Sequence, residues 1–278
     1  MNKIGILHPG EMGISIAAAA INNGHQVYWL PRGRSDQTRA RAEEQNLLEL
    51  DSPTEFCQTC ELIFSICPPH AAEEVAKFVI ESGFKGSYLD ANAISPQHTV
   101  EIGKLLEVNH ILFIDGGIIG GPAWKPNETW LYLSGKYANQ IAACFSNGPL
   151  ETKIIGDEIG KASALKMCYA AYSKGTTALL AAILATAESL GVREDLYHQW
   201  NMDDKDFSEQ VNRRVRRVTA KAWRFKGEMN EIAETFQGTG LPGEFHEGAA
   251  EVYRRISTFK DAVKTPALED VLRALLAQ

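Results

Sequence analysis

The sequence contains no apolar run that is long enough to span a membrane. Its longest run, ALLAAILATA at Ala178–Ala187, is far shorter than the roughly 20 residues that a transmembrane helix needs. No basic and apolar leader precedes Lys3 either. We therefore expect a cytoplasmic protein that does not bind membranes.

Excess positive charge is also absent. The 278 residues carry a formal net charge of −7, with 28 Lys and Arg against 35 Asp and Glu. Nonspecific binding to nucleic acid depends on phosphate neutralisation by Lys and Arg, so this balance argues against a nucleic-acid partner. Small molecules and other proteins are the expected partners. A hydrophobic content of 45% is ordinary for a soluble globular protein and suffices for a buried core.

Cysteine is scarce, and its count is odd. The five cysteines show no spacing of a disulfide framework, which is typical of a reducing compartment. Cys57 and Cys60 form a single C-x-x-C pair without a second pair of ligands, so we favour packing residues over redox or zinc chemistry. They fall in a predicted short helix with Ser52 as its cap and Pro53 in its first turn. No spacing of His, Cys or carboxylates resembles a metal site.

The first half of the chain alternates short β-rich runs with amphipathic helical patterns. The runs are KIGIL, QVYWL, LIFSIC, SYLDA and ILFIDGG, followed by TWLYLSG and KIIG. Such alternation predicts a parallel sheet with helices on both faces. After about Gly160 the pattern is helical, without a convincing strand. We predict an α/β domain at residues 1–158 and an all-helical domain at residues 159–278.

One long helix is predicted to join these domains. Residues 161–190 are apolar nearly all round, and Gly191 follows them as a C-terminal cap. At 1.5 Å per residue this helix would extend about 45 Å and would be buried on most faces. The remaining helices are too few to cover it. A second copy of the chain is therefore expected to help, which predicts a homodimer.

The first candidate site follows the first predicted strand. It comprises His8, Pro9, Gly10, Glu11, Met12 and Gly13. A dinucleotide-binding loop reads G-x-G-x-x-G here, and Gly10 and Gly13 occupy its second and third glycine positions. These positions let the backbone approach a pyrophosphate and let the next helix, whose N–H groups favour phosphate, pack closely on the sheet. Because His8 replaces the first glycine, a plain strand-to-helix turn is the alternative.

The second predicted strand ends at WLPRGRS, without the acidic residue that usually binds the ribose of NAD. Arg32, Arg34 and Ser35 stand there instead, around Gly33. Two guanidinium groups and a hydroxyl suit the 2′-phosphate of NADP. A solvated basic turn is the alternative. The loop and the arginine pair together favour NADP, or NADPH, as the cofactor.

These motifs resemble, in their order, those of the β-hydroxyacid dehydrogenase and 6-phosphogluconate dehydrogenase superfamily over nearly the whole chain. IGILHPGEMG resembles its glycine loop, SICPPH the loop near the nicotinamide, and LDANAISP the strand end that follows. DGGIIGG resembles its substrate-binding segment and GDEIGKASALKMCYA its catalytic helix. EMNEIAETFQGTGLPGEFHEGAAEVYRRI resembles an incompletely characterised branch. The resemblance implies a Rossmann-type doubly wound sheet followed by an all-α C-terminal domain.

The resemblance also implies a catalytic residue. Lys166 falls on the family's catalytic lysine, while Ala170 replaces the asparagine that follows it in the family. Desolvation on a mostly apolar helix would lower the pKa of this lysine from about 10.4 and suit it to proton transfer. Tyr169 and Ser173 share its helical face and would replace the missing hydrogen bond. The alternatives are a lysine whose head reaches solvent and a tyrosine of the core.

Further ligand contacts follow from the same resemblance. Ile119, Gly120 and Gly121 fall on the substrate-binding loop, where the family has a serine at the position of Ile119. The cofactor loop at the end of the run LIFSIC comprises Cys67, Pro68 and Pro69. Asn92 follows the next strand at the carboxyl edge of the sheet, so it is expected to contact substrate or the nicotinamide ribose. A plain turn asparagine is the alternative.

The leading hypothesis is therefore an NADP-dependent oxidoreductase that transfers a hydride between nicotinamide and a small polar hydroxy or keto compound. The departures at Ile119 and Ala170 count against the usual small hydroxyacid substrates. Imine reductases share the fold but often carry Asp or Tyr in place of the lysine, so imine reduction is the second hypothesis. A cofactor-binding protein without turnover is the third.

A basic run at residues 213–226 fits two interpretations. Its cations are Arg213, Arg214, Arg216, Arg217, Lys221, Arg224 and Lys226. They form an anion site for carboxylate or phosphate in the first interpretation. In the second, which we favour from the sequence, they belong to a solvated helix face or a subunit contact.

Overall fold

A computed structural model describes residues 1–260 and 262–277. The chain divides into two compact units, Met1–Met167 and Cys168–Gln278. The expected domain boundary, after residue 158, precedes the helix α7 (Lys161–Ala170), whereas the two units divide within this helix. No helix of the described residues is long and apolar enough to cross a membrane.

The first unit contains one eight-stranded sheet in the order β3-β2-β1-β4-β5-β6-β7-β8. Its strands are β1 (Lys3–Ile6), β2 (Gln26–Trp29), β3 (Leu48–Glu49), β4 (Leu62–Ser65), β5 (Ser87–Asp90), β6 (Leu112–Gly120), β7 (Thr129–Ser134) and β8 (Leu150–Ile154). Every neighbouring pair is parallel except β6 and β7, which are antiparallel. The seven strands expected from the sequence are confirmed, and β3, whose two residues are exposed, is additional.

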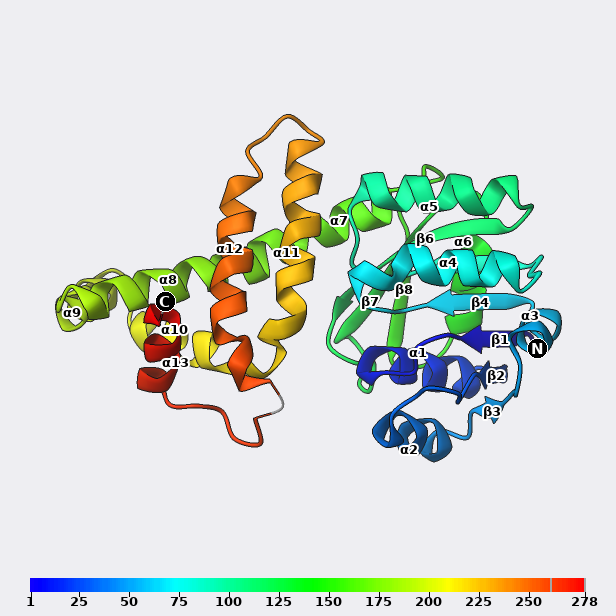
Figure 1. The fold of residues 1–278 in the computed structure, drawn as a ribbon, viewed down its shortest axis with the longest axis horizontal. Coiled ribbons are helices and arrows are strands. Elements are labelled where there is room, and N and C mark those ends of the chain that lie inside the picture. Colours follow the sequence, from blue (N-terminus) through cyan, green and yellow to red (C-terminus); the bar gives the residue numbers. More distant parts are fainter. Residues whose placement is uncertain (261, 278) are drawn as a thin grey trace. The chain divides into compact units, whose positions relative to one another are not determined.

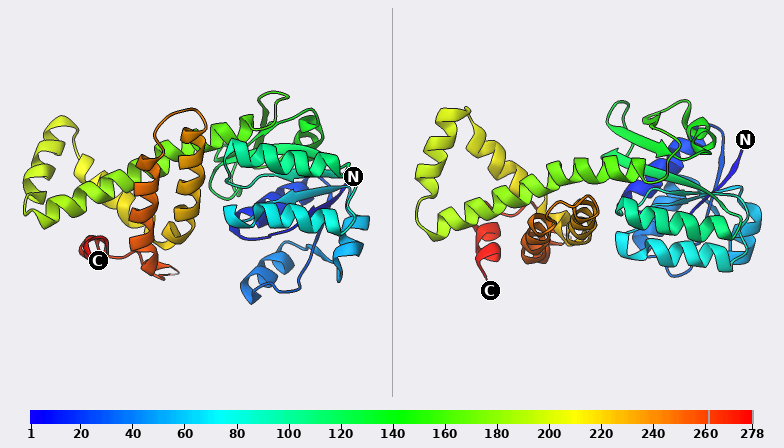
Figure 2. Two further views of the ribbon diagram at one scale, coloured as in Figure 1. Left: turned by 45° about the horizontal axis from the view of Figure 1, so that its top comes forward. Right: turned by 90° about the horizontal axis from the view of Figure 1, so that it is seen from above.

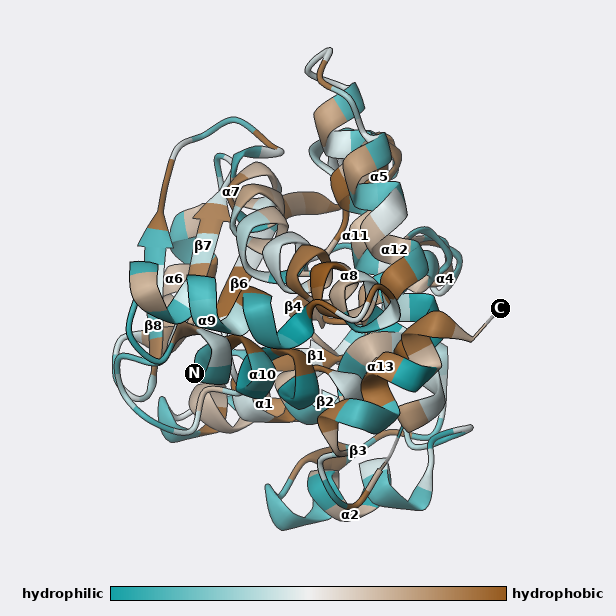
Figure 3. Ribbon diagram, turned by 90° about the vertical axis from the view of Figure 1, so that its left-hand side faces the viewer, coloured by the Kyte–Doolittle hydropathy of each residue, from teal (hydrophilic) through white to brown (hydrophobic). Residues whose placement is uncertain are grey.

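Helices cover both faces of this sheet (Figure 1). On one face, α1 (Glu11–Asn22), α2 (Asp36–Glu44) and α6 (Ala138–Ala142) contribute to one apolar core. On the other, α3 (Pro53–Thr59), α4 (Ala72–Glu81) and α5 (Pro96–Val108) contribute to a second core. The sheet lies between the two cores, and its inner strands are largely brown, hence hydrophobic, in Figure 3. This arrangement confirms the doubly wound fold.

The C-x-x-C pair belongs to the second of these cores. Ser52 caps α3 by accepting a hydrogen bond from the Glu55 N–H, and Pro53 stands in the first turn, as the sequence predicts. Cys57 and Cys60 are buried, and burial raises the pKa of their thiols to about 11 and about 12. Both are free thiols. Their protonated, buried state supports a role in packing.

The start of α7 is fixed to the sheet by one buried carboxylate. Asp115, on β6, is fully buried, and its Oδ2 accepts hydrogen bonds from the N–H groups of Gly160 and Ala162, each at 2.9 Å. Ser134 donates to the same oxygen at 2.8 Å, and Ser163 donates to Oδ1 at 2.6 Å. A helix N-terminus has unsatisfied N–H groups and a positive dipole end, so it stabilises this carboxylate. Asp115 therefore determines where α7 begins.

The second unit is helical throughout its described part. After α7 the chain continues through a π-helical turn, Ala171–Gly175, into α8 (Thr176–Ser189). The other helices are α9 (Arg193–Asp203), α10 (Phe207–Arg217), α11 (Ala222–Gln237), α12 (Glu244–Arg255) and α13 (Leu268–Leu276), with 3-10 turns at Thr219–Lys221 and Ile256–Phe259. In Figures 1 and 2, α11 and α12 lie side by side as an antiparallel pair.

The long helix expected at residues 161–190 is confirmed in extent but not in regularity. It is helical from Lys161 to Ser189, and Gly191 follows with φ of +73°, as a C-terminal cap requires. The π-helical turn interrupts its α-helical hydrogen bonding. Its expected burial is incomplete, because Tyr172 and Leu190 are 68% and 69% exposed.

We predict that Asp115→Asn lowers the free energy of unfolding by about 1–3 kcal/mol, because the new amide group faces N–H donors that then lack an acceptor. Chemical denaturation of both proteins measures this difference. Asp157→Asn, an exposed position in the turn before α7, is the control and should change stability little. Equal losses in the two variants would contradict the assigned role of Asp115.

Candidate functional site

The glycine loop lies between β1 and α1, as the sequence predicts. A Cβ built on Gly13 would lie 2.2 Å from the carbonyl oxygen of His8, so only glycine allows the helix to approach the loop this closely. A Cβ on Gly10 would meet nothing within 4 Å, so the space above this backbone is open. Gly10 is the N-cap of α1 and provides no side-chain acceptor for the first N–H groups of the helix. The loop therefore fits a phosphate group.

The other loop residues differ in their surroundings. Pro9 is buried, Met12 packs against the core, and Glu11 is exposed. His8 is partly buried, and its Nδ1 has no hydrogen-bond partner among the described residues. Burial, with a smaller contribution from the charge of Arg34, lowers the pKa of His8 to about 4. His8 is therefore a neutral imidazole at pH 7, and its Nδ1 is buried without a partner among the described residues.

The two arginines after β2, Arg32 and Arg34, lie in different surroundings. Arg34 turns back to the glycine loop, where its guanidinium donates to the carbonyl oxygen of Leu7 at 2.9 Å. Its Nε is buried without a partner among the described residues. Arg32 remains exposed in the turn. Ser35 caps α2, since its hydroxyl accepts a hydrogen bond from the N–H of Thr38 at 3.3 Å.

The order of strands places the glycine loop at the topological switch point of the sheet. The chain passes outward from β1 to β2 on one side and continues at β4 on the other. In open α/β sheets, ligands bind in the crevice at the carboxyl ends of such strands. The loops after β1 and β4 both lie there, so Gly10 and Cys67 belong to the same end of the sheet.

Asn92 joins the ends of β4 and β5. Its Oδ1 accepts a hydrogen bond from the N–H of Cys67 at 2.6 Å, and its Nδ2 donates to Ser65 at 3.1 Å and to Asp90 at 3.0 Å. The side chain is only 2% exposed, so both amide protons are used inside the protein. The contact with substrate or ribose that the sequence suggested stays a prediction, whereas the observed bonds make Asn92 a support for the Cys67 loop.

Two buried groups that can lose a proton lie next to Asn92: the carboxyl of Asp90 and the thiol of Cys67. Burial raises the pKa of Asp90 to about 7, and the nearby charge of Asp115 adds to the effect. The Cys67 thiol also has its pKa raised by burial, to about 12, which excludes a thiolate at neutral pH. After Cys67, Pro68 precedes a 3-10 turn that begins at Pro69, and Pro69 is buried. The Cys67 thiol lies 3.8 Å from the Ser65 hydroxyl, so its buried surroundings include polar groups.

Lys166 lies on α7 directly above the end of β6. A Cβ built on Gly117 would lie 2.5 Å from the Ala162 carbonyl oxygen and 3.2 Å from the Lys166 Cβ, so this glycine allows the helix to pack closely on the strand. The Lys166 ammonium donates a hydrogen bond to the carbonyl oxygen of Ile118. The lysine head is therefore directed to the strand end and not only to solvent. Gly117 and Asp115 were not recognised in the sequence, although both stand in the DGG motif.

The predicted substrate loop begins next to this contact. Ile119 is partly buried, and Gly120 has φ of +123°, a conformation that favours glycine. A Cβ at Gly120 would lie 2.2 Å from the carbonyl oxygen of Glu128. The Thr129 hydroxyl donates to the carbonyl oxygen of Gly121 at 2.7 Å and closes the base of the loop. The structure therefore brings Lys166 and this loop together within the first unit.

Tyr169 and Ser173 belong to the second unit. Tyr169 is 49% exposed, which argues against the alternative of a core aromatic. Ser173 lies in the π-helical turn and lines a cavity of the second unit. The expected α-helical spacing from Lys166 to Ser173 does not hold, because the π turn changes the helical phase.

Among the described residues, no group of three or more His, Cys, Asp or Glu could hold a metal ion.

A comparison with protein families decides the affiliation of the chain. Residues 3–143, half of the sequence, match the NAD binding domain of 6-phosphogluconate dehydrogenase. The chain belongs to this family. Residues 187–256 match a domain of unknown function, DUF1932. The resemblance recognised from the motifs is thereby confirmed. Membership indicates an oxidoreductase that uses a nicotinamide dinucleotide, and the open glycine loop fits such a cofactor.

Several known proteins are similar. An uncharacterised 28.5 kDa protein of Methanothermus fervidus is 29% identical over 195 residues, or 70% of this chain and 74% of its own. A solved conserved protein of unknown function, described as structurally similar to 3-hydroxyacid dehydrogenases, is 25% identical with a TM-score of 0.69, covering 99% of this chain and 100% of its own. Mycobacterium tuberculosis 3-hydroxyisobutyrate dehydrogenase, solved with L-serine, is 17% identical with a TM-score of 0.71 and 100% coverage of both chains.

A more distant likeness concerns the second hypothesis. An imine reductase of Streptomyces aurantiacus is 14% identical with a TM-score of 0.55, covering 99% of this chain and 100% of its own. At this identity the likeness shows a shared fold. Both the dehydrogenases and the imine reductase therefore share the architecture seen here.

We predict that Gly10→Ala impairs dinucleotide binding, whereas Gly13→Ala impairs stability. Gly10 has φ of −73° and open space above it, so alanine should leave the free energy of unfolding nearly unchanged but hinder dinucleotide binding. Gly13→Ala should lower that free energy by about 1–3 kcal/mol through overpacking. Thermal unfolding and fluorescence titration with NADPH and NADH measure both effects. Unchanged affinity in Gly10→Ala would show that no phosphate approaches this loop.

Proposed function

We propose that the protein is an NADP-dependent oxidoreductase that transfers a hydride between nicotinamide and a small polar hydroxy or keto compound. The observation that carries this proposal is the position of Lys166, whose ammonium group contacts the strand end that leads into Gly120 and Gly121. Lys166 is the general acid and base in this proposal. The dinucleotide, when bound, supplies the hydride acceptor or donor.

In this proposal the chain holds the proton at the Lys166 ammonium. In alcohol oxidation the neutral amine accepts the hydroxyl proton, and in carbonyl reduction the ammonium returns it to the nascent alkoxide. Ile118 orients the head through its carbonyl oxygen, a role that the family's asparagine would otherwise share. Ile119 adds an apolar side chain to the loop, so we expect substrates that do not need a serine contact there.

The residues that would hold the cofactor come from two loops of the first unit, the glycine loop and the turn after β2. The backbone from Gly10 to Gly13 would bind the pyrophosphate. Arg32 and Ser35 would bind a 2′-phosphate. Arg34, whose Nε has no partner among the described residues, would add positive charge next to the glycine loop. This set supports NADP over NAD, because it contains no carboxylate for the ribose hydroxyls.

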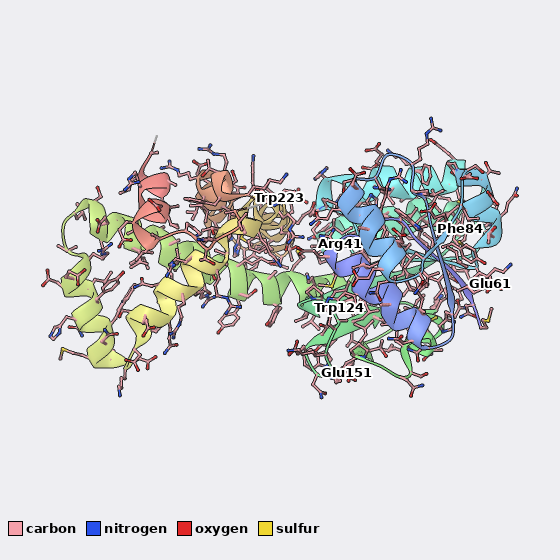
Figure 4. The ribbon with its side chains drawn as sticks, turned by 90° about the horizontal axis from the view of Figure 1, so that it is seen from below. Arg41, Glu61, Phe84, Trp124, Glu151 and Trp223 are labelled. Atoms are coloured by element: carbon pink, nitrogen blue, oxygen red, sulfur yellow. The ribbon has the colours of Figure 1, made fainter. Side chains whose placement is uncertain are left out.

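We predict that Arg32→Ala raises the Kd for NADPH about tenfold or more, the loss expected for one hydrogen bond to a charged group, while the Kd for NADH changes little. Arg41→Ala, on α2 (Figure 4), removes the same charge and is the control. Fluorescence titration measures both constants. Equal dissociation constants for NADPH and NADH in the wild-type protein would exclude the assigned preference.

We predict that Lys166→Met preserves the fold and NADPH affinity but lowers turnover by about 10²–10⁴-fold. Lys161→Met is the control, because Lys161 is exposed on the same helix and pairs with Glu158 at 3.3 Å. Initial rates on a panel of oxo-acids, aldehydes and cyclic imines provide the measurement. Near-normal turnover in Lys166→Met, combined with collapse in Tyr169→Phe, would move the proton donor to Tyr169.

That last outcome would favour the second candidate function, imine reduction. Two observations support keeping it: the fold is shared with an imine reductase, and Tyr169 is exposed. Oxidation of NADPH by cyclic imines, but by none of the oxo compounds, would establish it. Tight NADPH binding without turnover of any panel member would instead support a catalytically silent cofactor-binding protein.

We further propose a cytoplasmic homodimer formed by the second units. Its basis is a set of large apolar side chains that a single chain leaves exposed. They are Tyr169 at 49%, Leu179 at 43% and Leu190 at 69%. A second copy would bury them. Light scattering at micromolar concentration should give about twice the chain mass of 30.6 kDa, whereas the mass of one chain would contradict the dimer.

A further inference from the structure

The second unit contains a basic cavity that the proposed reaction does not use. Its volume is about 630 Å³, within the range of small-molecule pockets. Five cations line it: Lys174, Arg213, Arg214, Arg217 and Lys221. No acidic side chain is among the described residues of its lining. The cations come from the π-helical turn, from α10 and from the 3-10 turn before α11, so three separate segments converge on one concavity.

The π-helical turn builds one wall of this cavity. Arg214 donates from Nε to the Thr177 hydroxyl at 2.6 Å and from its terminal nitrogen to the Ser173 carbonyl oxygen at 2.7 Å. Both partners are neutral, so the guanidinium is held in place while its charge stays uncompensated by a carboxylate. Turns of this kind occur often at functional sites. Here the turn fixes one cation at the wall of the cavity.

The other cations differ in how much of their charge is compensated. Arg217 is exposed and forms no ion pair or hydrogen bond within the described part of the chain. Arg213 pairs with Glu209 at 2.7 Å, and Lys174 pairs with Glu228. Arg214 and Arg217 form no ion pair with a carboxylate within the described part of the chain. The cavity therefore has an excess of positive charge. In Figure 3, α10 is mostly teal while α8 is largely brown. Gln210, Arg213, Arg214 and Arg217 of the cavity lining belong to α10.

The lining also contains aromatic surface. Tyr172 and Phe225 both border the cavity, and the Lys174 ammonium lies 4.7 Å from the centre of the Phe225 ring. Converging guanidinium groups are suited to phosphate oxygens, which they bind through paired hydrogen bonds. Aromatic walls favour a ligand with a flat or apolar body. A solvated helix face would need neither the concavity nor the anchoring of Arg214.

We infer that this cavity binds a small molecule that carries a phosphate or diphosphate group. The phosphate lies against Arg214 and Arg217, and the remainder of the molecule packs on Tyr172 and Phe225. This inference does not depend on the oxidoreductase function, because it concerns binding that occurs without turnover. It also favours the anion-site interpretation of the basic run over the solvated face.

Inorganic pyrophosphate is the probe, titrated calorimetrically into the full-length protein at constant ionic strength without NADP. Saturable binding is expected, and Arg217→Ala should weaken it about tenfold, as for one lost hydrogen bond to a charged group. Glu209→Gln should strengthen it, since it releases Arg213 from its ion pair. Arg273→Ala and Glu251→Gln make the same charge changes on α13 and α12, and both should leave affinity unchanged.

The glycine loop of the first unit is a competing site for the same probe, so Gly10→Ala separates the two. Binding that Arg217→Ala weakens and Gly10→Ala retains supports the cavity. Binding that Gly10→Ala abolishes and Arg217→Ala retains would overturn the inference. So would the absence of saturable binding, or an equal loss in Arg217→Ala and Arg273→Ala, which would indicate general attraction of anions. Circular dichroism confirms that each variant is folded.

Discussion

The buried carboxylate of Asp115 is the interaction on which the candidate site depends. A charge in the interior is stable only when donors surround it, and the first N–H groups of α7 and two serine hydroxyls provide them. The helix is therefore tied to β6 at its first turn. Gly117 then lets the helix approach the strand, and the position of Lys166 follows. One electrostatic requirement thus sets both the start of the helix and the location of its lysine.

Most of the fold was predictable because its signals are local. Alternating β-rich runs, caps and glycine positions act within a few residues, so the strands, the loop at Gly10 and Gly13, and the two classes of unit follow from the sequence. The strand β3 lacks such a signal. Its residues, Leu48 and Glu49, are exposed and become a strand only by pairing with Tyr28 and Trp29 of β2.

The orientation of side chains was less predictable because it depends on neighbours that are distant in sequence. Asn92 has the position of a ligand contact, yet its amide is used by Cys67, Ser65 and Asp90. Arg34 has the position of a phosphate ligand, yet it donates to Leu7. The π-helical turn is a further example: an apolar helical pattern does not reveal it, and Ser173 consequently lines a cavity that spacing alone did not indicate.

The closed base of the loop between β6 and β7 has an evolutionary consequence. Gly120 and Glu128 approach each other too closely for any side chain at the glycine, and Thr129 bonds across to Gly121. Beyond this neck the chain returns to α1: Ala123 is 1% exposed in the core that α1 shares, and its N–H donates to the Ser15 hydroxyl of α1 at 2.9 Å. The predicted substrate loop and the helix that follows the glycine loop are therefore in direct contact. Exchanges at Ala123 or Ser15 act on both, so substrate choice and cofactor binding are expected to change together in evolution.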